Sequence, residues 1–241
     1  GNPYGAMMTN TNNETKSGNF SGNIYAQVEP IKNLRVRTVF GLQYNSSEYR
    51  SYTPLYQFSP YSQNLTQTKV TQNMSNYLSM VWTNTVSYDW NIKDHAFNAL
   101  LGMESFRDQG TYIAAGNAYL KEGFDSWKYA WVSNGTAASS SDGLSAAGHP
   151  NDETRRVSYF GRLGWNWMEK YMVNVTLRCD GSSNFAPGHR FGWFPSVSAG
   201  WNISSESFME STRGWLDFLK IRGSWGRVGN QNIKPYQFLA P

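Results

Sequence analysis

The fold is decided by residues 34–44, which read LRVRTVFGLQY. The even positions run from Leu34 to Tyr44 and carry mostly apolar or aromatic side chains, whereas the odd positions include Arg35 and Arg37. Because successive side chains of a strand point to opposite faces, this period of two predicts a strand with one apolar and one polar face. Its length matches the roughly 9–11 residues with which a tilted strand crosses a bilayer.

The same alternation recurs along the rest of the chain. Each repeat places apolar or aromatic side chains at every second position and polar or small side chains between them. We therefore predict an all-β protein of about eight strands. The seven further segments are residues 20–28, 78–90, 97–104, 157–167, 171–180, 197–203 and 219–225.

The connections between these segments alternate in length. Short turns are expected at residues 29–33, 91–95 and 168–170, and a longer link at 204–217 has room for one helical turn within 208–215. The long polar segments at 45–73, 107–153 and 181–192 are expected to be loops. In outer-membrane barrels short turns face the periplasm and long loops face outward. The alternation therefore favours an antiparallel transmembrane barrel segment.

The composition agrees with a wall that has lipid on one side and water on the other. Aromatic residues make up 16% of the 241 residues, although hydrophobic residues reach only 39%. The rings gather beside the short connections, as an interfacial aromatic girdle requires. These rings are Tyr88, Trp90 and Phe97, then Trp165, Trp167 and Tyr171, then Phe208, Trp215 and Phe218.

Several classes of function find no support in the sequence. The net charge of +4 comes from basic residues scattered along the chain, whereas a nucleic-acid binder more often has a basic patch. Cys179 is the only cysteine, and His95, His149 and His189 are far apart, so neither a disulfide nor a metal site is expected. No catalytic or cofactor-binding constellation is visible, and we expect no enzyme.

Three segments carry a resemblance to a known family. Residues 156–163 read RVSYFGRL, residues 177–201 read LRCDGSSNFAPGHRFGWFPSVSAGW, and residues 215–233 read WLDFLKIRGSWGRVGNQNI. They resemble the SusC/RagA family of TonB-linked outer-membrane transporters (TonB-dependent receptors) of Bacteroidetes. Weaker likenesses at residues 29–34 and 99–104 follow in the same order, so the resemblance covers nearly the whole chain.

The resemblance implies a 22-stranded barrel in the cell outer membrane, plugged by an N-terminal domain. Residues 1–241 would be part of that barrel, without the plug, the TonB box, the signal peptide and the remaining strands. No signal sequence is visible at the start, so further sequence is expected upstream. The resemblance also implies import of large nutrients, either glycans or peptides. A SusD-like surface lipoprotein would serve as a lid, and the TonB complex would supply energy.

Two groups of residues are candidates for function. Charged residues on the polar face would either form ion pairs with the plug or line the substrate path. In one long loop, the rings of Trp127, Tyr129 and Trp131 would either stack on sugar faces or pack the loop onto itself. The lumen-facing candidates are Arg35, Arg37, Glu104, Arg162, Arg178, Asp180, Lys220 and Arg222.

Two other interpretations stay open from the sequence. A secreted, soluble carbohydrate-binding β-sandwich would also contain many short strands and aromatic rings. A small porin-type barrel could close with eight strands. Both would lack the family resemblance of residues 177–201.

Overall fold

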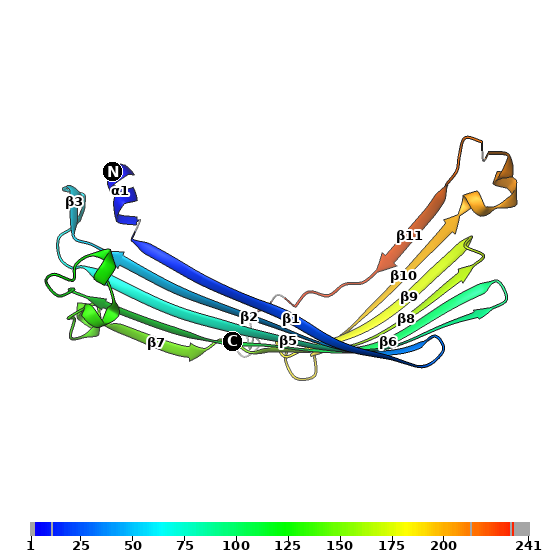
Figure 1. Cartoon of the computed structure of the whole chain (residues 1–241), viewed down its shortest axis with the longest axis horizontal. Helices are drawn as coiled ribbons and strands as arrows, with labels where there is room; N and C mark the ends of the chain where they lie inside the picture. The colour runs from blue at the N-terminus through cyan, green and yellow to red at the C-terminus, as the bar shows by residue number, and fades with distance from the viewer. Residues whose placement is uncertain (1–2, 11, 213, 232, 234–241) are drawn as a thin grey trace. The chain divides into compact units, whose positions relative to one another are not determined.

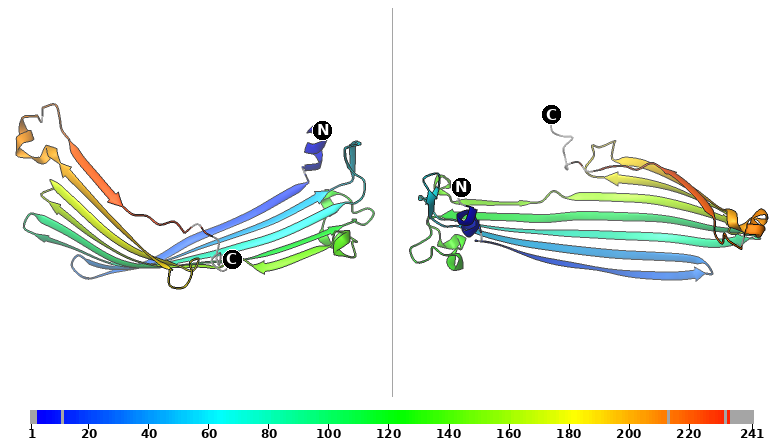
Figure 2. Two further views of the ribbon diagram at one scale, coloured as in Figure 1. Left: turned by 180° about the vertical axis from the view of Figure 1, so that it is seen from behind. Right: turned by 90° about the horizontal axis from the view of Figure 1, so that it is seen from above.

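The computed structural model describes residues 3–10, 12–212, 214–231 and 233. Its main feature is a nine-stranded sheet in the order β1-β2-β5-β6-β8-β9-β10-β11, with β7 paired to β6 (Figure 1). Every pair of neighbours from β6 to β11 runs antiparallel. Figure 2 shows β8, β9 and β10 side by side in both views.

The eight predicted strands are confirmed, and each corresponds to one strand of this sheet, although the predicted segments 197–203 and 219–225 each extend one residue beyond it. They are β1 (Asn13–Ile31), β2 (Leu34–Thr53), β5 (Lys69–Ile92), β6 (His95–Ala118), β8 (Thr154–Trp167), β9 (Tyr171–Ser182), β10 (Phe191–Asn202) and β11 (Lys220–Gly226).

The remaining elements are short. They are the helix α1 (Pro3–Asn10), the hairpin of β3 (Tyr56–Ser59) and β4 (Ser62–Asn64), the strand β7 (Ser145–Pro150), and the 3₁₀ turns η1 (Trp127–Tyr129), η2 (Val132–Asn134), η3 (Ser140–Asp142), η4 (Ile203–Ser205) and η5 (Ser207–Thr212). The sequence pattern did not predict α1. The helical turn expected within 208–215 forms as η5, slightly earlier and as a 3₁₀ helix.

Two of the expected loops are partly strands, and the sequence prediction was wrong there. β2 continues to Thr53, β5 begins at Lys69 and β6 continues to Ala118. In these extensions polar side chains occupy both faces, so the alternation that marks a strand in the sequence is lost. The connection between β9 and β10 is a loop as predicted, over residues 183–190.

The short turns are confirmed, and their backbone explains how so few residues reverse the chain. Asn33 has φ 67° and Lys93 has φ 53°, and in the third turn Met168 and Glu169 have φ 51° and 58°. Left-handed conformations match the twist of two antiparallel strands joined by a tight turn. At the first turn the Glu29 carboxylate accepts a hydrogen bond of 2.6 Å from the Asn33 backbone N–H.

The chain divides into two compact units, and β1, β2, β5 and β6 contribute to both. The first unit comprises residues 1–21, 43–78 and 109–153. Its small core is formed by Tyr52, Val70 and Ala130, with Leu120, Trp127 and Val132 packed against it. The second unit comprises residues 22–42, 79–108 and 154–241 and contains the paired strands β8 to β11.

The strand register of the second unit separates an apolar face from a polar one. Leu163, Val175, Val197 and Trp225 lie opposite one another across β8, β9, β10 and β11. The next position of each strand gives Gly164, Asn174, Ser198 and Ser224 on the other face. Large side chains on the apolar face are exposed, for example Leu101 at 68% and Leu163 at 50%. The side chains that the sequence pattern assigned to one apolar face therefore do lie on one face of these strands.

Aromatic rings form a continuous row beside the short turns. Trp90 stacks on Phe97 at 5.2 Å between ring centroids, Trp167 stacks on Tyr171 at 5.5 Å, and Tyr171 on Trp201 at 6.2 Å. His95 joins the two predicted groups by stacking on Phe97, Trp165 and Trp167 at 5.9–6.3 Å. The row matches the predicted girdle, although Phe208, Trp215 and Phe218 are exposed outside it.

Among the described residues, no helix is both long and apolar enough to cross a membrane. The same residues contain no group of three or more His, Cys, Asp or Glu side chains that could hold a metal ion.

We predict that the two faces tolerate charge differently. Val197→Arg would place a cation on the apolar face midway between Trp193 and Trp201, where lipid burial costs about 2–4 kcal/mol. Folding into lipid vesicles, followed by the electrophoretic shift of folded barrels, should show impaired assembly of the full-length protein. Ser198→Arg is the matched control on the polar face and should assemble normally. Equal losses for the two variants would contradict the assignment of the faces.

Candidate functional site

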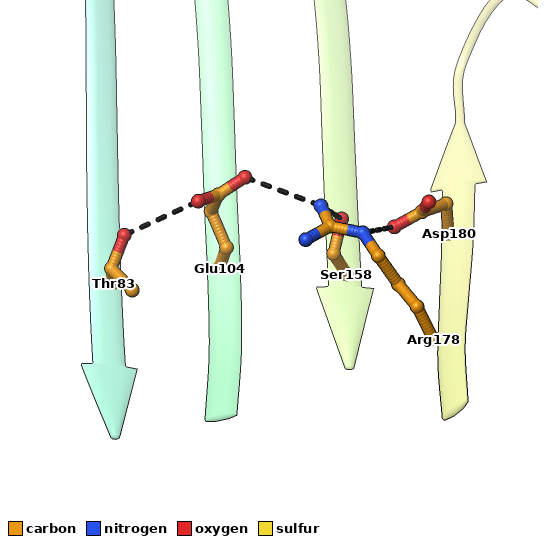
Figure 3. Close-up of polar contacts among 5 residues, drawn as sticks. All are labelled: Thr83, Glu104, Ser158, Arg178 and Asp180. Atoms are coloured by element: carbon orange, nitrogen blue, oxygen red, sulfur yellow. Dashed lines mark hydrogen bonds and ion pairs between the residues drawn. The ribbon is translucent and has the colours of Figure 1, made fainter. Parts of the chain in front are cut away.

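The polar face of the second unit contains a compact cluster of charged and hydroxyl side chains. Glu104, Ser158 and Asp180 occupy one cross-strand row of β6, β8 and β9. Arg178 lies two residues before Asp180 on β9, and Thr83 projects from β5 (Figure 3). We call Thr83, Glu104, Ser158, Arg178 and Asp180 the Arg178 cluster.

Arg178 is the centre of this cluster. Its Nε donates to Asp180 Oδ1 at 2.6 Å, and its Nη2 donates to Ser158 Oγ at 2.9 Å (Figure 3). The same Nη2 lies 3.5 Å from Glu104 Oε1. Thr83 Oγ1 then donates to the other Glu104 oxygen at 3.4 Å. One guanidinium thus joins two carboxylates and links strands β6, β8 and β9, as its planar fork of donors allows. The bond between Thr83 and Glu104 extends the network to β5.

An aromatic ring supports the guanidinium from the neighbouring row. Gly102, Phe160 and Arg178 face one another across β6, β8 and β9, and the Arg178 guanidinium lies 5.4 Å from the Phe160 ring centroid. A Cβ atom at Gly102 would come within 2.3 Å of that ring. Glycine at 102 therefore allows Phe160 to lie against the strand, where it packs beside the cation.

The structure places the other predicted polar-face residues in separate contacts. Arg35 pairs with Asp89, and the Arg37 guanidinium lies 4.7 Å from the Tyr25 ring centroid. Arg162 Nη2 donates to Asn174 Oδ1 at 3.1 Å. Lys220 Nζ lies 3.2 Å from Met172 Sδ, and Arg222 is opposite Gly200. Of the eight candidates, only Glu104, Arg178 and Asp180 come together in one cluster.

A second polar group lies at the short-turn end of the same unit. Glu206, between η4 and η5, accepts hydrogen bonds from the Tyr171 hydroxyl at 2.7 Å and from the Trp201 indole at 3.1 Å. Lys170 Nζ lies 3.2 Å from its other oxygen. The two hydrogen bonds and the Lys170 ammonium hold the pKa of the Glu206 carboxyl below its ordinary value of 4.5. Glu206 thus fixes the 203–219 link to the ends of β9 and β10.

In the first unit, the three predicted loop aromatics pack within the unit. The Arg50 guanidinium, from β2, lies between two indole rings, 4.0 Å from the Trp127 centroid and 4.2 Å from that of Trp131. Tyr129 makes an edge contact with Phe124 at 5.5 Å. Of the two uses considered for these rings, the contacts match packing of the loop. Stacking on sugars stays a prediction, and Trp131 is 45% exposed.

Some residues of the site were missed by the candidate set drawn from the sequence. Thr83 and Ser158 have the correct parity in the alternation, but nothing in the sequence indicates that they bond to Glu104 and Arg178. Arg50 lies in a segment that was expected to be a loop. The partner of a strand residue depends on strand register, which the pattern of a single strand does not contain.

The geometry first defines a class: an antiparallel sheet with an exposed apolar face, an aromatic row at the turn end and a polar face crossed by ion pairs. This is the organisation of a transmembrane β-barrel wall. No protein-family model matches the chain. Comparisons with individual proteins are more informative.

The chain is similar to TonB-dependent receptors. It is 28% identical over 244 residues to receptor P3 and 30% identical over 244 residues to receptor P26, both of Formosa agariphila. These alignments cover 99% and 98% of the chain and 23% of each relative. TonB-dependent receptor SusC of Bacteroides thetaiotaomicron is 46% identical over 77 residues, which is 32% of the chain and 8% of SusC.

A solved structure is also similar to the chain over nearly its whole length. The RagAB peptide transporter matches 97% of the chain with a TM-score of 0.78 and 26% identity, over 25% of the matched transporter chain. The chain thus spans about a quarter of the length of the proteins it matches. Over nearly its whole length the chain is similar to a segment of a SusC/RagA-like TonB-dependent receptor barrel. The resemblance inferred from residues 177–201 is confirmed.

We predict that Arg178→Ala destabilises the barrel by roughly 1–2 kcal/mol, because it leaves two partly exposed carboxylates without their common donor. The midpoint of urea unfolding of the full-length protein in lipid vesicles measures this loss. Arg178→Lys should recover only part of the stability, because an ammonium group cannot form the planar fork. If Arg178→Ala, Arg178→Lys and the parent unfold at the same urea concentration, the cluster does not stabilise the sheet.

We also predict a pH response from Glu206. Because its pKa is lowered in the folded protein, its contribution is complete above its ordinary pKa and is lost as the pH falls through the lowered value. Unfolding midpoints compared between about pH 6 and about pH 3 should fall less in Glu206→Gln than in the parent protein. Asp217→Asn, in the same link, is the matched control and should keep the parent's response. An unchanged pH response in Glu206→Gln would contradict the prediction.

Proposed function

We propose that this chain forms part of the wall of a TonB-dependent transporter that imports large nutrients across the bacterial outer membrane. The single observation that carries the proposal is the structural likeness to the RagAB peptide transporter over 97% of the chain. The two sequence relatives aligned over nearly the whole chain are also TonB-dependent receptors. None of these relatives is named as an enzyme.

The polar face is proposed to face the lumen, and the apolar face to contact lipid. Hydrated charges cost little beside water, whereas an arginine at the bilayer midplane costs about 2–4 kcal/mol. The predicted lumen residues all lie on strands of the sheet, and Arg35, Glu104, Arg178 and Asp180 are engaged in ion pairs. Such a face suits either a luminal domain or a passing hydrophilic substrate.

The cargo is proposed to be a large nutrient, either glycan or peptide. The name of the RagAB relative supports peptides, and the resemblance to the SusC/RagA family supports both classes. We further propose that a SusD-like surface lipoprotein covers the outer opening and that the TonB complex supplies energy. Both partners follow from the resemblance.

The alternatives from the sequence fit the fold less well. A soluble β-sandwich would cover its apolar face with a second sheet. In the described part of the chain, the only other sheet is the short β3–β4 hairpin. A small porin-type barrel would require this sheet to close on itself, and the described strands form an open path from β1 to β11.

Uptake by cells that express the full-length protein tests the proposal. We expect labelled oligosaccharides or peptides, too large for general porins, to enter only when both the protein and a functional TonB complex are present. In cells that have both, deletion of the gene for a SusD-like partner should lower the uptake. A small solute supplied in parallel controls for leakage. Uptake that persists without TonB would contradict the proposal and would favour an ungated pore.

A further inference from the structure

The polar face of the second unit contains a cavity of about 630 Å³ that the transport proposal does not assign. Four members of the Arg178 cluster line it: Glu104, Ser158, Arg178 and Asp180. The loop between β9 and β10 and residues 227–231, after β11, form its other sides. Its volume lies within the range of about 300–1,000 Å³ that is usual for pockets that bind small ligands.

The charges around the cavity do not balance. Four arginines line it, and only two carboxylates, Glu104 and Asp180, do so. Both carboxylates are engaged by Arg178. Within the described part of the chain, the other three arginines form no ion pair. These three are Arg156, Arg190 and Arg227.

Arg156 is held in place but has an unused donor. Its guanidinium lies 3.8 Å from the Phe106 ring centroid, which fixes the position of the group. Its Nε is buried and has no hydrogen-bond partner among the described residues. A buried donor without an acceptor costs free energy. Arg190 Nε already donates to the Phe185 carbonyl at 3.3 Å, which holds the loop arginine beside the cavity.

Aromatic rings complete the lining. Phe185, Phe191 and Phe194 all border the cavity. The Phe194 ring lies close to the backbone of Gly229, where an added Cβ would come within 2.3 Å of it. This close approach fixes the ring between β10 and the segment that follows β11. The cavity therefore combines cationic donors with an apolar wall.

From this combination we propose that the cavity binds a peptide that carries a carboxylate next to an apolar side chain. The carboxylate would accept hydrogen bonds from Arg156 and its neighbouring arginines, and the apolar side chain would lie against Phe185 and Phe194. A neutral glycan would leave the positive charge uncompensated. This inference deepens the proposed transport function and rests on it, because it takes the polar face to be the face that substrates contact.

The test compares two peptides on the full-length protein in detergent. The first probe is an acetylated, fluorescent hexapeptide of alternating glutamate and phenylalanine, and the second has glutamine in place of glutamate. Fluorescence anisotropy should show tighter binding of the glutamate peptide, by about tenfold, as expected for charge-assisted hydrogen bonds. Raising the salt concentration should reduce the difference.

Matched variants locate the effect. The double variant Arg156→Gln and Arg227→Gln should remove most of the preference for glutamate. Arg155→Gln removes the same type of charge from the neighbouring position of β8, outside the cavity lining, and it should leave the preference intact. Equal binding of the two peptides, or a preference that survives the double variant, would overturn the proposal. Tighter binding of oligogalacturonate than of the glutamate peptide would also overturn it, since an acidic glycan would then be the ligand.

Transport assays separate this proposal from the proposed function. If cells import large nutrients in a TonB-dependent manner but the double variant keeps its charge preference, the cavity assignment fails and the transport function stands. If the purified protein binds the glutamate peptide through Arg156 and Arg227 but no TonB-dependent uptake occurs, the site stands and the transport function fails.

Discussion

Strand register is the constraint on which the rest of this structure depends. In a sheet that has lipid on one side, every backbone N–H and C=O must be satisfied by a neighbouring strand, because hydrocarbon offers no alternative partner. This hydrogen-bonded pairing of strands, the ladder, in turn fixes which side chains lie together. A slip of one residue between β8 and β9 would turn Arg178 to the apolar face, which Val175 and Leu177 of the same strand now occupy. The same ladder brings Glu104, Ser158 and Asp180 into one row, within reach of a single guanidinium.

The two faces also explain which parts of the fold could be predicted from the sequence. Between Leu34 and Tyr44 one face is apolar and the other polar, and the contrast makes the strand visible. Beyond Tyr44 the strand continues to Thr53 through mostly polar residues on both faces, so the sequence resembles a loop. The helix α1 was missed for a related reason. It is only eight residues long and contains Gly5, and it lacks the repeated apolar spacing that would mark a helix.

The site was predictable only in part. Parity placed Glu104, Arg178 and Asp180 on the polar face, but which of the eight charged candidates meet is determined by register and by side-chain reach. The loop aromatics illustrate the same limit. Trp127 and Trp131 are close in sequence, yet the group that lies between their rings is Arg50, from a strand far earlier in the chain. The arginines of the cavity come from β8, from β9, from a loop and from the segment after β11, and no local motif links them.

The glycines of the polar face have a consequence for how far its side chains project from the sheet. At Gly102 the Phe160 ring lies across the strand, in the space where a side chain would otherwise stand. At Gly164 an added Cβ would come within 3 Å of side-chain atoms of both Asn98 and Asn174. At these two positions the absence of a side chain leaves room for a neighbouring side chain to lie against the strand. On a barrel of fixed circumference, side chains that lie flat against the strands leave more open width inside than side chains that stand upright.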